Sequence, residues 1–165
     1  MKKIIKITLT VVLLFSHTFA CAKDLRKELE SAYNRARNNI SKNTPEDFLK
    51  SIYITSSEEA DIKGLIQNWN NQETKNVLIN LAFRDLKTTN FLEVRQNKDI
   101  ASYYYRTDDP QNTEIEVYMI KFKSISGTWK PQNEIYSIGV SREGGETEIQ
   151  TKIKKALLED KNFQL

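Results

Sequence analysis

The side chains with the widest chemical repertoire are a single histidine and a single cysteine, and both lie near the start of the chain. His17 and Cys21 precede a predicted cleavage point after Ala22. Imidazole and thiolate groups are required for Ser-His-Asp or Cys-His catalysis and for His/Cys zinc sites. Removal of residues 1–22 would therefore exclude these chemistries from the mature protein and leave carboxylates and tyrosines as its candidate functional groups.

Residues 1–22 have the composition of a signal peptide. The positive start holds Lys2, Lys3 and Lys6, the apolar core runs from Ile7 to Phe15, and Ala20-Cys21-Ala22 places small residues at the positions that a signal peptidase reads. The apolar core is too short for a transmembrane helix, which needs roughly 20 apolar residues. We therefore expect a soluble protein that starts at Lys23 and is periplasmic or secreted. A lipoprotein acylated at Cys21 is the less favoured alternative, because Thr18 and Phe19 fit such a site poorly.

Cleavage also changes the charge balance. The whole chain holds 25 Lys and Arg residues against 22 Asp and Glu residues. The leader contains three lysines and no acids, so the mature chain would be neutral. A neutral domain lacks the basic surface that nucleic-acid binding requires. The composition thus predicts no nucleic-acid partner, and no transmembrane span after leader removal.

Two acidic groups have spacings that could suit chemistry. Glu114 and Glu116 lie on one face of a predicted strand, where paired carboxylates act as acid and base only if their environments separate their pKa values. Asp108-Asp109 and Asn112 offer oxygen ligands for calcium, but not at the D-x-D-x-D-G spacing. A solvated strand face and a turn explain these groups better. We therefore expect no catalytic residue, no cofactor and no metal.

Aromatic side chains in the second half of the chain are the candidates for ligand binding. The wall of a hollow interior would be formed by Tyr103, Tyr105, Tyr118 and Trp129. On a strand, Tyr103 and Tyr105 share one face and Tyr104 takes the other. Burial in a filled core is the alternative interpretation of the same side chains.

Helical periodicity organises the first half of the mature chain. The apolar stripe of a first helix, capped by Asp24, consists of Leu25, Leu29, Ala32, Tyr33, Ala36 and Ile40. A short second helix starts at Thr44-Pro45-Glu46-Asp47, with threonine as cap and proline at the first helical position. A third follows a capping box of Ser56 and Glu59, and an apolar fourth, residues 77–86, is expected to be largely buried.

From Asn90 onward the apolar period changes to about two, which predicts an antiparallel meander. The expected strands are 91–96, 99–107, 113–124 and a last one from 128 through 134 to 140. In the third, the side chains of Ile115, Val117 and Met119 point one way and those of Tyr118, Ile120 and Phe122 the other. Gly144-Gly145 then leads into an amphipathic helix with Ile149, Ile153, Ala156 and Leu157, which we expect to dock on its own domain.

Three short motifs are similar to those of the nuclear transport factor two-like superfamily, whose cone-shaped fold is shared with ketosteroid isomerases and polyketide cyclases. They are Thr44-Pro45-Glu46-Asp47-Phe48-Leu49, like that family's "PEDFV"-type helix, Asp99-Ile100-Ala101-Ser102-Tyr103-Tyr104-Tyr105, and Ser126-Gly127-Thr128-Trp129-Lys130, like its "G-x-W-K" hairpin. The resemblance covers roughly residues 24–140. The family's enzymes use an aspartate or histidine base that cannot be matched to a residue of this sequence. The helix after Gly145 and the fourth helical segment depart from the family pattern.

Together these patterns predict an α+β domain, in which N-terminal helices pack on a curved, cone-like antiparallel sheet of four or more strands, plus a C-terminal amphipathic helix. We expect the signal peptide at 1–22, the nuclear transport factor two-like domain at 23–143 and the helical extension at 144–165.

For function we expect an exported, non-catalytic binding module that engages an envelope protein partner or a small apolar ligand; an inhibitor or immunity-type protein is one such module. The alternatives are a small carboxylate- and tyrosine-dependent isomerase, cyclase or hydrolase on the same fold, and a component of an envelope assembly whose last helix docks on another protein.

Overall fold

The computed structural model describes residues 24–42 and 44–164, apart from the side chains of residues 57, 81, 133 and 134. The predicted signal peptide, with His17 and Cys21, lies outside the described residues. Within the described part of the chain, none of the helices combines the length and the apolar character that crossing a bilayer requires.

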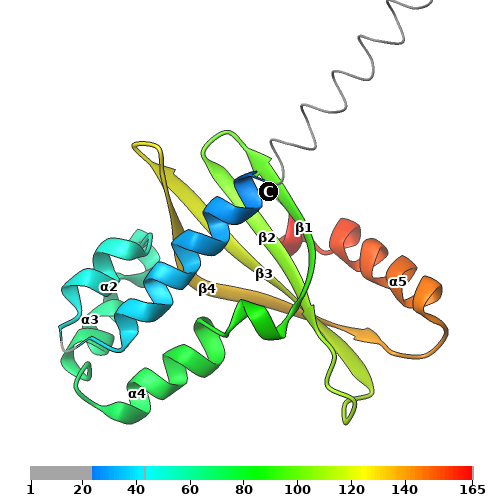
Figure 1. The fold of residues 1–165 in the computed structure, drawn as a ribbon, viewed down its shortest axis with the longest axis horizontal. Helices are drawn as coiled ribbons and strands as arrows, with labels where there is room; N and C mark the ends of the chain where they lie inside the picture. The colour runs from blue at the N-terminus through cyan, green and yellow to red at the C-terminus, as the bar shows by residue number, and fades with distance from the viewer. Residues whose placement is uncertain (1–23, 43, 165) are drawn as a thin grey trace, which may run out of the picture.

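A four-stranded antiparallel sheet lies between two layers of helices (Figure 1). The strands are β1 (Asn90–Asn97), β2 (Ile100–Thr107), β3 (Glu114–Ile125) and β4 (Thr128–Ser141). Their order in the sheet is β1-β2-β3-β4, so each strand pairs with its neighbour in sequence. The predicted meander is confirmed, and β1 and β4 form its two edges.

Helices of the first half cover one face of the sheet (Figure 1). They are the helix of residues 24–40, α2 (Glu46–Ser51), α3 (Glu59–Gln67) and α4 (Gln72–Val77), which continues into a π-helical turn at Leu78–Ala82. On the opposite face lies α5 (Glu146–Glu159). The predicted α+β class, with N-terminal helices, an antiparallel sheet and a C-terminal helix, is therefore confirmed.

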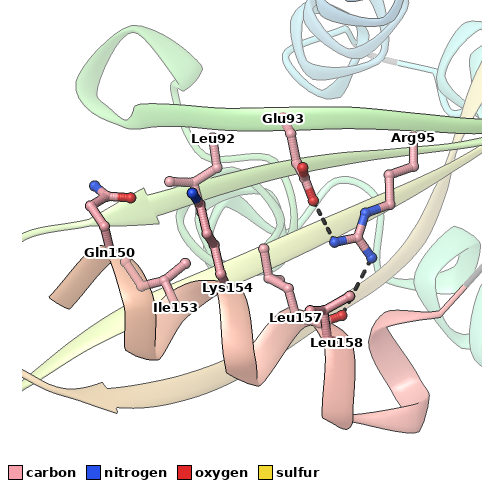
Figure 2. Close-up of a pocket in the computed structure, with 8 residues that line it drawn as sticks. All are labelled: Leu92, Glu93, Arg95, Gln150, Ile153, Lys154, Leu157 and Leu158. Atoms are coloured by element: carbon pink, nitrogen blue, oxygen red, sulfur yellow. Dashed lines mark hydrogen bonds and ion pairs between the residues drawn. The ribbon is translucent and has the colours of Figure 1, made fainter. Parts of the chain in front are cut away.

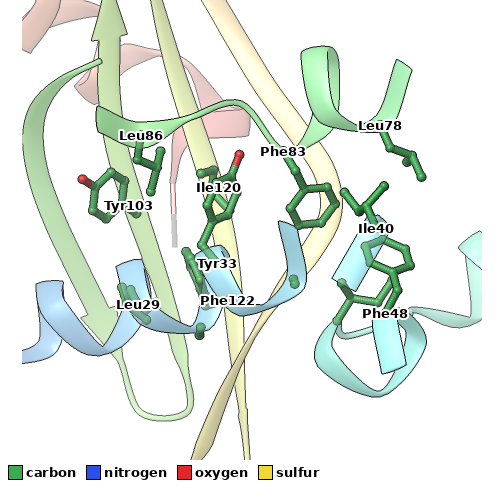
Figure 3. Close-up of a cluster of buried hydrophobic side chains, with 14 of the residues drawn as sticks. Leu29, Tyr33, Ile40, Phe48, Leu78, Phe83, Leu86, Tyr103, Ile120 and Phe122 are labelled. Atoms are coloured by element: carbon green, nitrogen blue, oxygen red, sulfur yellow. The ribbon is translucent and has the colours of Figure 1, made fainter. Parts of the chain in front are cut away.

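The larger core fills the space between the sheet and the N-terminal helices (Figure 3). Helix 24–40 lies across the sheet and buries Leu29, Tyr33, Ala36 and Ile40 completely, which is the stripe expected from the sequence. Aromatic rings close the far end of this core. The Phe48 ring centroid lies 5.3 Å from that of Trp69 and 5.5 Å from that of Phe83.

The fourth helical segment is less buried than its composition suggests. Leu78, Phe83 and Leu86 are buried, but Val77 is 50% exposed. The Phe83 amide donates to the Leu78 carbonyl at 2.7 Å, a bond that spans five residues and widens the turn. The apolar stripe shifts at this point, which leaves Val77 on the outer side.

The capping box before α3 lies one residue earlier than expected. The backbone amide and the hydroxyl of Thr55 lie 2.7 and 2.6 Å from Glu58 Oε2. Residues Ser56–Glu58 form a 3-10 turn ahead of the α-helix, so the cap is the residue before that turn. The pairing of Ser56 with Glu59 is therefore wrong.

A smaller core lies beneath α5. The helix buries Ile149, Ile153 and Leu157 against the sheet, as expected from its narrow apolar stripe. The sheet side of this core contains Tyr104, Ile115, Val117, Met119 and Val140. Residues of α5 and Phe163 thus share a core with the sheet, and Tyr104 lies on the opposite face from Tyr103 and Tyr105, as predicted.

Candidate functional site

Three of the four predicted ligand-binding residues come together on the face of the sheet that the N-terminal helices cover. The Tyr103 and Tyr105 ring centroids are 6.3 Å apart, and the Tyr105 ring stacks on Tyr118 at 5.1 Å with an interplanar angle of 13°. Trp129 lies further along the sheet, where it opposes Ser124. It borders a shallow surface depression beside helix 24–40 rather than the tyrosine group.

Helix 24–40 covers the space that a hollow cone would offer to a ligand. Tyr103 and Tyr105 are buried against this helix and its neighbours, while Tyr118 is half-buried. Figure 3 shows Leu29 and Tyr33 of the helix lying against Tyr103, Ile120 and Phe122 of the sheet. These tyrosines therefore serve as core residues in this structure.

A carboxylate does lie within hydrogen-bonding distance of one of these tyrosines. The Tyr103 hydroxyl donates to Glu30 Oε1 at 2.7 Å, and Arg26 Nε donates to the same oxygen at 2.7 Å. Burial, together with the bond to Glu30, raises the pKa of Tyr103. A tyrosine that holds its proton so firmly is a poor acid catalyst. The arrangement serves best as a tie between helix 24–40 and the sheet.

Tyr105 has a hydroxyl group that is buried and has no hydrogen-bond partner among the described residues. Burial raises the pKa of this phenol, and the nearby Arg84 opposes the shift only in part. The guanidinium carbon of Arg84 lies 4.8 Å from the Tyr118 ring centroid, so the arginine caps the stacked pair. An unpaired buried hydroxyl costs stability and marks a point where the core is not optimised.

An apolar pocket lies on the other face, between α5 and the edge strand β1 (Figure 2). We call it the α5–β1 groove, and its volume is about 260 Å³. The lining residues are Leu92, Glu93, Arg95, Gln150, Ile153, Lys154, Leu157 and Leu158. Its floor is aliphatic, and apart from the exposed Leu158 its rim is polar, which is how a pocket for an apolar anchor side chain is built.

A bulge in β1 creates one wall of this groove. Phe91 pairs with Tyr105 and Glu93 with Tyr104, so Leu92 is an extra residue in the β1 strand. Figure 2 shows Leu92, Glu93 and Arg95 all extending from β1 toward α5. Simple alternation would have placed Leu92 on the opposite face from the other two. Sequence reasoning missed the groove because a bulge in an apolar edge strand has no clear signal in the residue pattern.

Arg95 links the two sides of the groove. Its Nη2 pairs with Glu93 Oε1 at 2.5 Å, its Nη1 donates to the Leu157 carbonyl at 3.3 Å, and its guanidinium carbon lies 4.8 Å from the Tyr104 ring centroid. The carboxylate of Glu93 is thereby neutralised. Lys154 on the opposite rim is exposed and has no ion-pair partner among the described residues. The rim therefore keeps one uncompensated positive charge, which favours an occupant with a negative charge beside its apolar part.

The acidic groups singled out in the sequence make turn and ion-pair contacts or lie toward the surface. Asp109 Oδ1 accepts from the Gln111 amide at 2.9 Å, which is an Asx turn. Asp108 pairs with Arg106 at 3.2 Å. Glu114 is exposed and Glu116 is half-exposed. In the described part of the chain, no three His, Cys, Asp or Glu side chains gather closely enough to hold a metal ion.

Comparison with known proteins adds no relative. No family model matches this chain, and no curated protein or solved structure matches it at a significant level.

Proposed function

We propose that this chain is an exported, non-catalytic binding protein, and that its α5–β1 groove receives an apolar anchor side chain of a protein partner. The observation that carries this proposal is the bulge at Leu92 and Glu93, which turns Leu92 toward α5 so that its aliphatic side chain lines the groove. Bulges recur next to functional sites because they redirect side chains.

The charge around the groove indicates what the partner should carry. Glu93 and Arg95 neutralise each other, whereas Lys154 is free to pair with an incoming carboxylate. The expected partner segment has an aliphatic or aromatic residue close to an Asp or Glu. A protein segment fits better than a free small molecule, because the groove volume of about 260 Å³ is below the range of about 300–1,000 Å³ that is usual for ligand pockets.

Export is part of this proposal and is supported by the leader of residues 1–22. N-terminal sequencing of protein recovered from the periplasm or the medium should give Lys23 as its first residue. A diacylated Cys21 in mass spectrometry would replace soluble export with membrane anchoring. The proposed relationship to the nuclear transport factor two-like superfamily is supported by the three motifs and by the order of helices followed by a meander.

Site-specific photo-crosslinking tests the groove. A photoreactive amino acid replaces Leu158, which is 69% exposed on the groove rim, and in a matched control it replaces Val77, which is 50% exposed on α4. In cells that produce and export the chain, we expect a crosslinked protein adduct from position 158 and none from position 77. The purified pair should then bind at least tenfold more weakly with Leu158→Asp and unchanged with Val77→Asp. Adducts of equal yield at both positions, or no adduct, would overturn the proposal.

Native mass spectrometry separates the protein partner from a small ligand. The exported chain should have its sequence mass alone. A copurifying small molecule that Leu158→Asp removes would assign the groove to an apolar ligand instead.

The envelope-assembly alternative required a last helix that is free to dock elsewhere. Because α5 buries Ile149, Ile153 and Leu157 on its own sheet, only its outer face and the groove rim are open to a partner.

The enzyme alternative is favoured by one observation, the contact of Glu30 with Tyr103. If this pair were catalytic, Glu30→Gln would abolish turnover of a substrate without loss of stability. We expect the reverse outcome, a loss of stability with unchanged partner binding.

A further inference from the structure

The face of the sheet that α5 covers is covered only in part. Its core ends at a row of residues that lie opposite one another on neighbouring strands: Tyr104 pairs with Met119, and Met119 pairs with Tyr136. Beyond this row, toward the two hairpin ends, the same face holds no buried apolar cluster among the described residues. We call this second half the open half; Ser102 in it is fully buried, whereas Ile100 and Ile125, nearer the hairpin turns, are exposed to a partner.

Lysines dominate the open half. Lys123 lies directly opposite Ile100 on β2 and Lys130 on β4, and Lys121 lies two residues away on the same side of β3. Like charges directly opposite each other on neighbouring strands are destabilising. Asp99 pairs with Lys123 at 2.6 Å, whereas in the described residues Lys121 and Lys130 have no carboxylate partner. The surface thus keeps an excess of positive charge at a cost to the fold.

Two isoleucines flank these lysines at the ends of the hairpins. Ile100 follows the β1–β2 turn and is 38% exposed, and Ile125 precedes the β3–β4 turn and is 39% exposed. The two turns are adjacent, because the Ser124 amide donates to the Asp99 carbonyl at 2.7 Å. Both isoleucines lie on the lysine side of the sheet, since Ile100 opposes Lys123 and Ile125 lies two residues beyond it. We call Ile100, Lys121, Lys123, Ile125 and Lys130 the basic end.

We propose that the basic end binds an anionic lipid surface, independently of the α5–β1 groove. Lysines around a few aliphatic residues are typical of proteins that rest on a membrane, with the aliphatic groups in the interfacial layer and the ammonium groups at anionic headgroups. A protein interface is the poorer match, because such interfaces favour arginine and aromatic residues over lysine. No cavity among those described is lined by residues of the basic end. The basic end therefore offers no pocket for an anchor side chain of a protein partner.

The start of helix 24–40 lies on the same side of the molecule as the basic end (Figure 1). Helix 24–40 begins at the end of the molecule where both hairpins turn (Figure 1). Lys27 and Ser31, in its first turns, line the same surface depression as Gly127 and Thr128 of the β3–β4 hairpin. A molecule that rests on the basic end therefore has its N-terminal helix starting on the membrane side.

Vesicle co-sedimentation tests the proposal. The exported, processed chain is mixed with vesicles of phosphatidylcholine alone or with added phosphatidylglycerol. We expect binding to the anionic vesicles only, and weaker binding as salt is raised. Replacement of lysine near an anionic surface should weaken binding about fivefold per residue, so Lys123→Gln with Lys130→Gln should lower the affinity by about 25-fold.

Matched variants locate the surface. Lys152→Gln with Lys155→Gln removes the same number of lysine charges from α5, outside the α5–β1 groove, and should leave vesicle binding unchanged. Ile100→Ser with Ile125→Ser should remove the binding that persists at high salt. The proposal is overturned if the wild-type chain does not bind anionic vesicles. It is also overturned if the α5 variant loses as much affinity as Lys123→Gln with Lys130→Gln. Retention on a polyglutamate resin without vesicle binding would assign the basic end to an acidic protein. Circular dichroism melts confirm that each variant is folded.

Discussion

Leu92 and Glu93 are adjacent in β1, yet both side chains lie on the α5 side of the sheet (Figure 2). The bulge that produces this arrangement moves Phe91 and Val94 together into the larger core, where both pack against buried residues. It also places Arg95 above Tyr104, on the α5 side. One extra residue in an edge strand thus determines which β1 side chains enter the larger core and which line the groove.

Arg95 should stabilise the packing of α5 against the sheet. Arg95→Ala removes the ion pair to Glu93, the bond to the Leu157 carbonyl and the contact with Tyr104, and should lower the free energy of unfolding by about 1–2 kcal/mol. Arg95→Lys should recover less than half, because an ammonium group cannot make these contacts at once. Urea denaturation measures both values. Lys154→Ala, on the exposed rim, should stay within about 0.5 kcal/mol of wild type.

Ile153 is the most buried residue of α5, at 1% exposure. Ile153→Ala should cost about 2 kcal/mol or more, as for other large-to-small changes in a core. Deletion from Glu146 onward should lower the melting temperature strongly, because Tyr104 and Val117 would become exposed. An unchanged melting temperature after this deletion would show that α5 is not part of the stable fold. Leu158→Ala, at the exposed rim, serves as the control.

Two neighbouring tyrosines should respond in opposite directions to loss of the hydroxyl. The Tyr104 hydroxyl donates to the Phe163 carbonyl at 2.8 Å, so Tyr104→Phe should destabilise the protein by about 1 kcal/mol. The Tyr105 hydroxyl is buried without a partner among the described residues, so Tyr105→Phe should be neutral or stabilising by up to about 1 kcal/mol. Thermal melts of the two variants compare the signs directly. A larger loss in Tyr105→Phe than in Tyr104→Phe would contradict the structure.

Alkaline pH should destabilise the protein through its buried phenols. Burial raises the pKa of Tyr33, Tyr103 and Tyr105 above the ordinary value. The unfolded chain then loses these protons near pH 10 while the folded chain keeps them. The stabilising contribution is therefore complete below about pH 10 and decreases as the pH rises further. Urea midpoints across this range should decrease, and the decrease should be smaller in Tyr105→Phe.

The capping box gives a sharp comparison between adjacent residues. Thr55→Ala removes the hydroxyl that contacts Glu58 and should cost about 1 kcal/mol. Ser56→Ala should change the free energy of unfolding by less than about 0.5 kcal/mol, because Ser56 lies inside the 3-10 turn and is exposed. Equal losses in the two variants would argue for the other register.

The sequence by itself determined the elements and the faces that they bury. A spacing of three and four residues identified helix 24–40 and α5, and a period of two separated Tyr104 from Tyr103 and Tyr105. These features are local, because the geometry of a helix or strand alone determines which side chains share a face. The α+β class followed from the order of these elements.

Tertiary structure decided what the faces enclose. The sequence offered the tyrosines as either a pocket wall or a core, and the position of helix 24–40 across the sheet made them core. The bulge at Leu92, the shift of the cap to Thr55 and the groove beneath β1 depend on pairing and packing between segments far apart in the chain. Side-chain periodicity does not encode such relations, since a single inserted residue reverses every face that follows it.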